Sequence, residues 1–234
     1  MPAPVSVIIP TLNAADRIGP TLGGLASGLT EGLICELILA DGGSKDDIAG
    51  IADAAGATLV KTAPGRGTQL AAGVAAARGD WFLILHADTV LPDGWPDMLR
   101  AHMRARPDRA GWFRLGFDDP GLPARIVAGW ANLRSRLLGL PYGDQGLFLP
   151  RKLYSDAGGY PAIPLMEDVA LARKLRGRMT ALPGRVTTGA DRYRAEGWLR
   201  RGSANLWTLL RYLFGADPET LARSYGAQSN HDNS

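Results

Sequence analysis

A histidine and a carboxylate lie two residues apart at the end of one strongly apolar segment. Residues 81–85 read Trp-Phe-Leu-Ile-Leu and are followed by His86 and Asp88. Because side chains alternate along a strand, residues two apart project in the same direction. An imidazole nitrogen and a carboxylate oxygen both suit a divalent ion such as Mn²⁺. The spacing therefore indicates a metal site at this strand end, with a solvated strand terminus as the alternative.

Two further apolar segments end in distinctive residues. Residues 7–13 read Val-Ile-Ile-Pro-Thr-Leu-Asn, and Pro10 ends the strand ladder there, which leaves exposed backbone that can face a flat ring such as a nucleobase. Residues 39–47 read Leu-Ala-Asp-Gly-Gly-Ser-Lys-Asp-Asp, and Asp41 emerges at the strand tip before glycines that permit a tight turn. A carboxylate there can accept a hydrogen bond from an imide N–H, as in uracil. The alternative is that Asp41 belongs only to the turn.

Short apolar segments alternate with amphipathic or alanine-rich segments along the first half of the chain. We expect strands at residues 5–9, 36–40, 58–61 and 81–85, with helices at 18–29, 46–55 and 68–78. This order predicts an α/β fold with a mostly parallel sheet and helices on both faces. The carboxyl ends of parallel strands share one edge, where open α/β sheets bind ligands. The three strand ends should therefore lie together.

In the second half of the chain, strands and helices no longer alternate regularly. We expect strands at 110–117 and 146–149, helices at 95–106, 124–138, 151–157, 197–214 and 218–225, and one helix that starts at residue 167. The helix at 197–214 is aromatic and amphipathic, which favours packing on the core or against a second copy over lying on a membrane. One domain over residues 1–234 is the simplest organisation, with a division near residue 115 and a flexible polar tail at 226–234.

Composition is that of a globular protein. Of 234 residues, 46% are hydrophobic and 21% are charged, and the formal net charge of +3 suits an anionic small molecule. The absence of a dense basic run disfavours nucleic acid as a partner. The single cysteine, Cys35, excludes an internal disulfide, and its apolar surroundings in the sequence predict a buried thiol. Neither a signal peptide nor an apolar run of about 18 residues is present, so we expect a cytoplasmic protein.

The three strand ends together resemble the inverting glycosyltransferases of family 2, which adopt the GT-A fold. The likeness is carried by residues 6–13, by residues 41–46 and by the His-Ala-Asp at 86–88, and it covers nearly the whole chain. It implies a metal-dependent enzyme that uses a nucleotide sugar, UDP-linked, and that binds Mn²⁺ or Mg²⁺ through Asp88. Residues 1–115 would then bind the donor, and residues 116–225 would bind the acceptor and supply the catalytic base.

Two positions depart from the family's pattern. His86 replaces the first acid of the family's Asp-x-Asp, and Gly42 replaces the second acid that usually follows Asp41. The first departure leaves two roles open for His86, which either contacts ribose or joins the metal shell. The second weakens any ribose contact expected beside Asp41.

Residues 164–173 resemble the family's Glu-Asp signature at a helix start. This likeness implies that Asp168 is the general base, because an acceptor hydroxyl has a very high pKa and needs a positioned proton acceptor as it attacks the anomeric carbon. A single in-line displacement then inverts that carbon. Glu167 orients the loop or serves as a partner of the helix dipole, which is also the alternative for Asp168.

Basic side chains are needed where the nucleoside diphosphate departs. Arg66 lies just before the start of the helix expected at 68–78, and helix N-termini bind anions. The family resemblance implies that Arg192 and Arg194 belong to a basic segment that covers the diphosphate. Each arginine taken singly could equally be a solvated surface charge.

The acceptor side is expected around residues 142–146, which read Tyr-Gly-Asp-Gln-Gly. Asp144 and Gln145 can bond acceptor hydroxyls, or Asp144 is a turn residue, and Trp198 can stack on a sugar. Residues 143–146, together with residues 66–69, 86–88 and 214–219, resemble one subgroup of the family. Its members are small bacterial transferases that are grouped with radical-SAM enzymes and linked to arsenosugar biosynthesis.

The predicted site thus has three parts. The donor part comprises Pro10, Thr11, Leu12, Asn13, Asp41, Arg66, His86, Ala87, Asp88, Arg192 and Arg194; the catalytic part comprises Glu167 and Asp168; the acceptor part comprises Asp144, Gln145 and Trp198. The expected partners are a nucleotide sugar and a small-molecule or lipid-linked acceptor, with a homodimer or peripheral membrane association as further options.

Two rival functions remain. A non-catalytic nucleotide-sugar-binding module would explain the missing first acid at His86. A nucleotidyltransferase would need a glycine-rich, arginine-containing loop after the first strand. Residues 13–17 read Asn-Ala-Ala-Asp-Arg there, which argues against this function.

Overall fold

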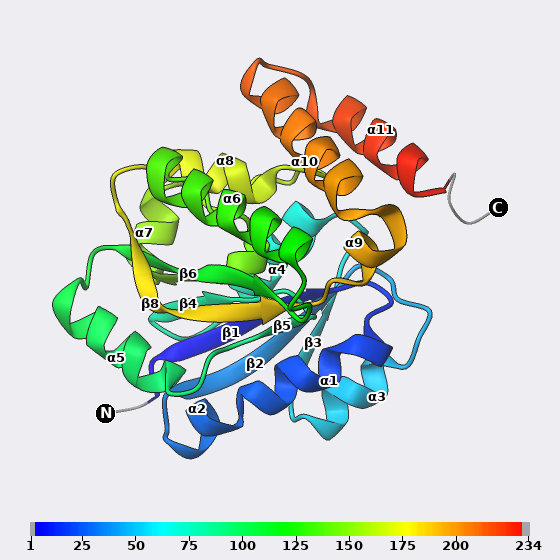
Figure 1. Ribbon diagram of the computed structural model, residues 1–234. Helices are drawn as coiled ribbons and strands as arrows, with labels where there is room; N and C mark the ends of the chain where they lie inside the picture. Colours follow the sequence, from blue (N-terminus) through cyan, green and yellow to red (C-terminus); the bar gives the residue numbers. More distant parts are fainter. Residues whose placement is uncertain (1–2, 231–234) are drawn as a thin grey trace.

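The computed structural model describes residues 3–230, which form one mixed sheet with helices on both faces (Figure 1). The strands are β1 (Val5–Thr11), β2 (Ile34–Asp41), β3 (Thr58–Lys61), β4 (Trp81–Ile84), β5 (Thr89–Val90), β6 (Ala110–Phe117), β7 (Leu147–Pro150) and β8 (Met179–Thr188). Their order in the sheet is β3-β2-β1-β4-β7-β6-β8-β5. β3, β2, β1 and β4 are parallel, as are β6 and β8, whereas β7 runs antiparallel to both of its neighbours. The predicted α/β fold with a mostly parallel sheet is confirmed.

The helices divide between the two faces of the sheet. One face is covered by α1 (Ala15–Gly24), α2 (Ala26–Thr30), α3 (Ile48–Ala54) and α5 (Trp95–Ala105), and the other by α4 (Arg66–Ala76), α7 (Arg151–Asp156) and α8 (Glu167–Lys174). α6 (Leu122–Leu138) packs on β6. α9 (Asp191–Glu196) and α10 (Trp198–Leu213) follow β8, α10 packs on α6, and α11 (Pro218–Asn230) packs on α10.

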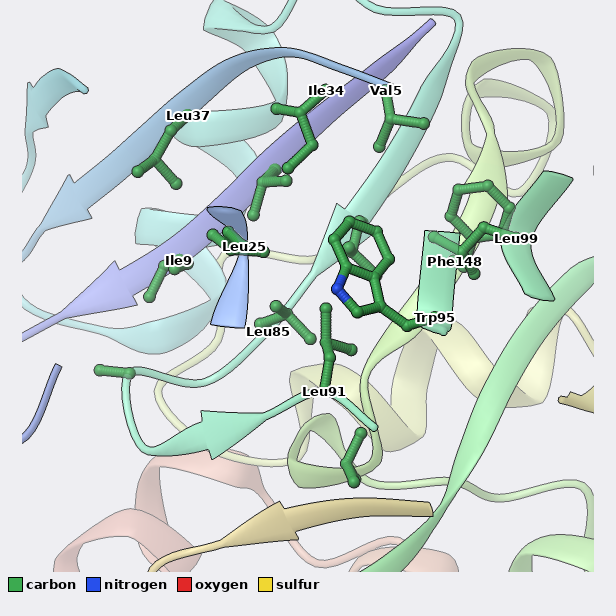
Figure 2. Close-up of a cluster of buried hydrophobic side chains, with 14 of the residues drawn as sticks. Val5, Ile9, Leu25, Ile34, Leu37, Leu85, Leu91, Trp95, Leu99 and Phe148 are labelled. Carbon is green, nitrogen blue, oxygen red and sulfur yellow. The ribbon is translucent and has the colours of Figure 1, made fainter. Parts of the chain in front are cut away.

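The central strands are apolar on both faces because helices cover both. Along β1, Val7 and Ile9 enter the core beneath α1 and α5, whereas Ile8 enters the core beneath α4 and α8. This alternation follows from the two-residue period of a strand. Trp95 at the start of α5 fills the centre of the first core (Figure 2), where its indole N–H donates to the carbonyl of Gly24. The two cores fix the strand ends that form the site.

Several elements differ from the sequence-based expectation. The helix expected at 18–29 is two helices that break at Leu25, because the preceding pair of glycines has low helix propensity. β8 was not expected, since Pro183 and Gly184 interrupt it and its pairing with β6 shifts register nearby. Cys35 is exposed rather than buried, and its thiol donates to the carbonyl of Val5.

The C-terminal part extends further than expected. α11 continues to Asn230, into the range that was predicted to be a flexible tail, and residues 231–234 lie outside the described part of the chain. Within residues 3–230, none of the helices combines the length and the apolar character that crossing a bilayer requires.

Candidate functional site

The ends of β1, β2 and β4 lie side by side, as the sequence predicted. Thr11 pairs with Asp41 across β1 and β2, and its hydroxyl donates to the Asp41 carboxylate at 3.2 Å. His86 and Asp88 follow β4, the strand on the other side of β1. A cavity of about 470 Å³ opens at this edge. Open α/β sheets place their ligands in such a crevice.

The cavity collects most of the predicted site residues. Its walls include Pro10, Thr11, Leu12, Arg66, His86, Ala87, Asp88, Asp144, Glu167, Asp168 and Arg192. Five predicted residues do not line it, namely Asn13, Asp41, Gln145, Arg194 and Trp198.

The carboxylate of Asp41 accepts hydrogen bonds from its own loop and from Thr11. Its carboxylate accepts hydrogen bonds from the Thr11 hydroxyl, from the Ser44 hydroxyl, and from the backbone N–H groups of Gly43 and Ser44. These donors fill the roughly four acceptor positions of a carboxylate. They also hold the pKa of Asp41 below its usual value, although burial opposes them. This geometry favours the turn role, because an imide N–H would have to displace one of these donors, and base binding by Asp41 stays a prediction.

Gln145 is a structural residue rather than an acceptor contact. Its side chain is fully buried, accepts from the hydroxyl of Ser135 at 2.6 Å and from the N–H of Tyr142, and donates to the carbonyl of Phe113. These bonds tie the short helix η1 (Gly143–Gln145) to α6 and β6. Gln145 thereby fixes the position of the neighbouring Asp144, which does line the cavity.

Arg194 and Asn13 also serve local structure. Arg194 on α9 forms ion pairs with Asp118, Asp119 and Asp191, and it is absent from the cavity wall. Three carboxylates already pair with it, so the structure favours a local role, and contact of Arg194 with the diphosphate stays a prediction. Asn13, in the left-handed region at φ 49°, accepts from the N–H of Lys45 and so links the loops that follow β1 and β2.

Trp198 was predicted on the acceptor side of the site, but it does not line the cavity. Its ring stacks on Tyr193 at a centroid distance of 4.9 Å and meets Phe117 edge to face. It lines a second hollow beside the cavity.

The ring of His86 lies against Gly143 of η1. Its Nε2 is buried without a hydrogen-bond partner, and a Cβ at Gly143 would lie only 2.4 Å from it, so only glycine fits there. Burial, with help from Arg66 and Arg192, lowers the pKa of His86 well below its ordinary value. The ring is therefore neutral, which is the form of histidine that ligates metals. A metal that used Nε2 would have to displace Gly143.

Asp88 is the residue best placed to hold a divalent ion. It lines the cavity, and Thr188 of β8 donates to its Oδ1 at 3.4 Å. In the part of the chain that the structure describes, no three His, Cys, Asp or Glu side chains form a complete metal cage. One carboxylate beside an open cavity instead fits the mode in which Mg²⁺ and similar ions are held by one or two carboxylates together with substrate phosphates.

Asp168 and Glu167 occupy the first turn of α8. Asp168 accepts from the N–H of Gly143 at 2.9 Å and from the N–H of Val169 at 2.7 Å, which fixes its carboxylate at the cavity wall. Glu167 is 1% exposed and lies 3.6 Å from the Arg66 guanidinium. Burial, and secondarily the charge of Asp168, raises the pKa of Glu167 to about 7, while Arg66 opposes the shift.

Asp144 is the third carboxylate of this wall. Its Oδ1 is buried and has no hydrogen-bond partner. Burial raises the pKa of Asp144 to about 6; Arg134 opposes this shift, and the charges of Asp168 and Asp88 add to it. The wall thus holds two carboxyl groups, Asp144 and Glu167, whose pKa values burial raises, a pattern that is concentrated at functional sites.

Several residues of the cavity wall were not predicted as part of the site, and Arg17, Gln69 and Arg201 are among the polar ones. Gln69 is buried on α4, and its amide donates to the carbonyls of Thr11 and Ala40, which holds the ends of β1 and β2 together. Its place three residues after Arg66, one helical turn along, was the signal that could have found it. Nothing in the sequence separates Arg201 from its neighbour Arg200.

Comparison with known proteins identifies the family. The model of the family described as glycosyl transferase family 2 matches residues 6–144. Glucosyl-3-phosphoglycerate synthase of Mycolicibacterium paratuberculosis is 37% identical over 97 residues, which is 38% of this chain and 29% of that protein. The chain therefore spans less than a third of the length of this curated relative.

Solved structures share the fold at low sequence identity. Staphylococcus aureus TarS (residues 1–349), in complex with UDP-GlcNAc, superposes with a TM-score of 0.60 at 17% identity, covering 80% of this chain and 58% of that one. Glucosyl-3-phosphoglycerate synthase from Mycobacterium tuberculosis, in complex with Mn²⁺, UDP and glucosyl-3-phosphoglycerate, gives 0.54 at 22% identity, covering 87% and 78%. At these identities the likeness establishes the GT-A-like fold.

Proposed function

The chain belongs to glycosyl transferase family 2, and from this premise we propose that it moves a sugar from a UDP-linked donor to an acceptor hydroxyl with inversion. One observation carries the proposal. A single cavity at the strand edge brings Asp88, which follows β4, together with Asp168, which begins α8, although they are far apart in sequence. One carboxylate can anchor a metal–diphosphate and the other can accept a proton, which are the two needs of this reaction.

Asp168 is the proposed general base. The acceptor O–H gives its proton to the Asp168 carboxylate while the acceptor oxygen forms a bond to the anomeric carbon. The bond from that carbon to the diphosphate oxygen breaks, and its electron pair leaves with UDP. The backbone N–H of Gly143 holds the base in place, so η1 and α8 act as one unit.

Asp88 is the proposed protein ligand of Mn²⁺ or Mg²⁺. Bound there, a divalent ion supplies positive charge that offsets the charge of the departing diphosphate. The synthase from M. tuberculosis contains Mn²⁺ and UDP in its crystal structure, which supports this choice of ion and nucleotide. Arg66 at the first residue of α4, and Arg192 beyond β8, line the same cavity and are proposed to contact the diphosphate.

The two halves of the chain divide the work in this proposal. Residues 1–115 bind the nucleotide sugar, and residues 116–225 supply the base and the acceptor side. The acceptor is a small molecule or a lipid-linked alcohol, and we place the enzyme in the cytoplasm. The arsenosugar-linked subgroup is the finer assignment that residues 143–146 and 86–88 support. Self-association into a homodimer is a further part of the proposal.

The experiment is a donor screen with a binding control. Wild-type protein is incubated with UDP-glucose and UDP-GlcNAc with and without Mn²⁺, and UDP release is followed. We expect slow donor hydrolysis that needs Mn²⁺ and is lost in Asp88→Asn, while Asp156→Asn, a surface control on α7, behaves as wild type. Binding of the donor without any turnover would favour the rival function, a non-catalytic nucleotide-sugar-binding module.

A further inference from the structure

A second hollow, of about 290 Å³, adjoins the cavity between α6 and the α9–α10 segment. Four residues line both spaces, namely Tyr142, Asp144, Tyr193 and Asn205. The two spaces therefore share a wall, and Asp168 lies on the far side of it, bonded to the N–H of the residue between Tyr142 and Asp144. The segment that separates the two spaces is therefore hydrogen-bonded to the proposed base.

The hollow is polar at its shared end and apolar away from it. At the shared end, the Oδ1 of Asp144 is buried and the Asn205 amide donates to the Tyr193 hydroxyl at 3.0 Å. Away from it, the wall is formed largely by apolar side chains such as Trp130 on α6 and Leu206 on α10. This polarity matches a molecule with a hydroxylated head and an apolar body.

Apolar side chains continue outward from the hollow. Apart from Leu12 and Leu29, every exposed large apolar side chain in the described residues lies on α6, on α10 or at Phe214 directly after α10. Ile126 and Trp130 are about half exposed and also line the hollow, so they form its mouth. A soluble domain rarely gathers exposed apolar side chains in this way without a ligand or partner that covers them.

Resting on the proposed function, we propose that the hollow between α6 and α10 binds the apolar body of an amphiphilic acceptor alcohol, whose hydroxyl crosses the shared wall to Asp168. The proton of that hydroxyl passes to Asp168, its oxygen bonds to the anomeric carbon, and UDP departs as in the reaction above. A second copy of the chain could cover the exposed face. It would give no reason for a hollow that shares a wall with the catalytic cavity, so the amphiphile is the occupant that the geometry favours.

Gly202 offers a way to fill the hollow without touching the cavity. It lies on α10 in the hollow's wall, and a Cβ there would make only an ordinary 3.6 Å contact with Val127. Gly202→Phe therefore places a ring in the hollow. Gly129→Phe is the matched control, because Gly129 is exposed on α6, has nothing within 4 Å of an added Cβ, and does not line the hollow.

The test measures binding of hexyl, heptyl and octyl β-D-glucosides by calorimetry below the concentrations at which they form micelles. For wild type and Gly129→Phe, we expect the dissociation constant to fall about fourfold per added methylene, as burial of a CH₂ group predicts. For Gly202→Phe, we expect binding at least tenfold weaker, with UDP binding in the presence of Mn²⁺ unchanged. Leu206→Gln, which makes the wall polar, gives a second reading should Gly202→Phe fail to fold.

Three outcomes would overturn the inference. They are glucoside affinity that does not depend on chain length, affinity that Gly202→Phe and Leu206→Gln leave intact, and a wild-type dimer that these variants dissociate while no glucoside binds. Measuring UDP binding distinguishes failure of this inference from failure of the proposed function. If the wild type binds UDP but no alkyl glucoside, only the acceptor class is removed, whereas absence of UDP binding in the wild type removes the function on which it rests.

Discussion

Asp168 differs from the other carboxylates of the cavity in how it is held. Two backbone N–H groups fix it, one from its own helix and one from Gly143 of η1. We expect Asp168→Asn to lower kcat by about 10²- to 10⁴-fold, since general bases contribute about that much. UDP affinity should change little, because the amide keeps the shape of the side chain. Steady-state kinetics with calorimetric UDP binding tests this, and Asp156→Asn is the control.

That assignment fails under one clear result. If Asp168→Asn turns over at the wild-type rate with unchanged donor affinity, the proton acceptor is another group, and Asp144 is the next carboxylate in the wall.

Glu167 predicts a pH dependence of stability. Burial raises its folded-state pKa to about 7, from an ordinary value of 4.5. Between these values the folded protein holds a proton that the unfolded chain has released, so stability is greatest at low pH and declines as pH rises toward and through 7. The loss is on the order of 3 kcal/mol, from about 1.4 kcal/mol per pKa unit.

The measurement is urea unfolding of wild type and Glu167→Gln between pH 5 and pH 8. Asp144 adds a decline of the same sign in both proteins, because burial raises its pKa as well. The difference between the two unfolding free energies therefore isolates Glu167. It should shift by a few kcal/mol in favour of Glu167→Gln as the pH rises, and a difference that stays constant would refute the buried, uncharged Glu167.

At the residue scale, the sequence predicted which residues gather but not always what they do. Asp88 was expected at a strand end, and Arg66 and Asp168 were expected at helix starts; all three line one cavity. Asp41 and Gln145 were expected to face ligands, yet their polar atoms are bonded within the protein. Residue type states what a side chain can donate or accept. It does not state whether a neighbour distant in sequence has already taken the bond.

At the element scale, α4 and the segment before α8 are locked together at Gly67. A Cβ there would lie 2.3 Å from the carbonyl oxygen of Pro161 and 2.7 Å from that of Ile163. These are backbone atoms, so the segment that leads to Glu167 and Asp168 would have to move. We expect Gly67→Ala to cost about 1–3 kcal/mol, the range for overpacking, and to lower kcat more than UDP affinity.

The control for this variant is Gly23→Ala in α1. An added Cβ at Gly23 meets nothing within 4 Å, so it should stabilise the helix by about 0.5–1 kcal/mol. Urea unfolding of both variants checks the contrast. Equal stability of Gly67→Ala and wild type would mean that α4 and α8 are not coupled through this contact.

Elements with a clear period were predicted well. The strands at 58–61 and 110–117 have the expected bounds, and α8 begins at Glu167 as expected. β8 was missed because proline and glycine at its middle mask the pattern of a strand, while its partner β6 supplies the pairing. That pairing is a long-range contact, so no local signal reports it. β8 matters because it delivers Thr188 to Asp88 and leads into Arg192.

At the scale of the whole molecule, the binding of UDP should stabilise the fold. The cavity wall includes residues from β1, from the segment after β4, and from α4, η1, α8 and α9, so a bound nucleotide joins elements from both halves of the chain. UDP with Mn²⁺ at about 100 times its dissociation constant should add roughly 2.7 kcal/mol to the free energy of unfolding. Thermal unfolding with UDP, GDP and ADP checks this, and equal shifts for all three would contradict recognition of uracil.

The most direct test of the proposed site is calorimetric binding of UDP to wild type and Asp88→Ala, each with and without Mn²⁺. Asp88 lines the cavity, and no other described carboxylate follows the end of β4 so closely. We predict that Mn²⁺ strengthens UDP binding to wild type at least tenfold and that Asp88→Ala loses this gain while staying folded. Equal UDP affinity in all four cases would contradict a metal–diphosphate site at this strand edge.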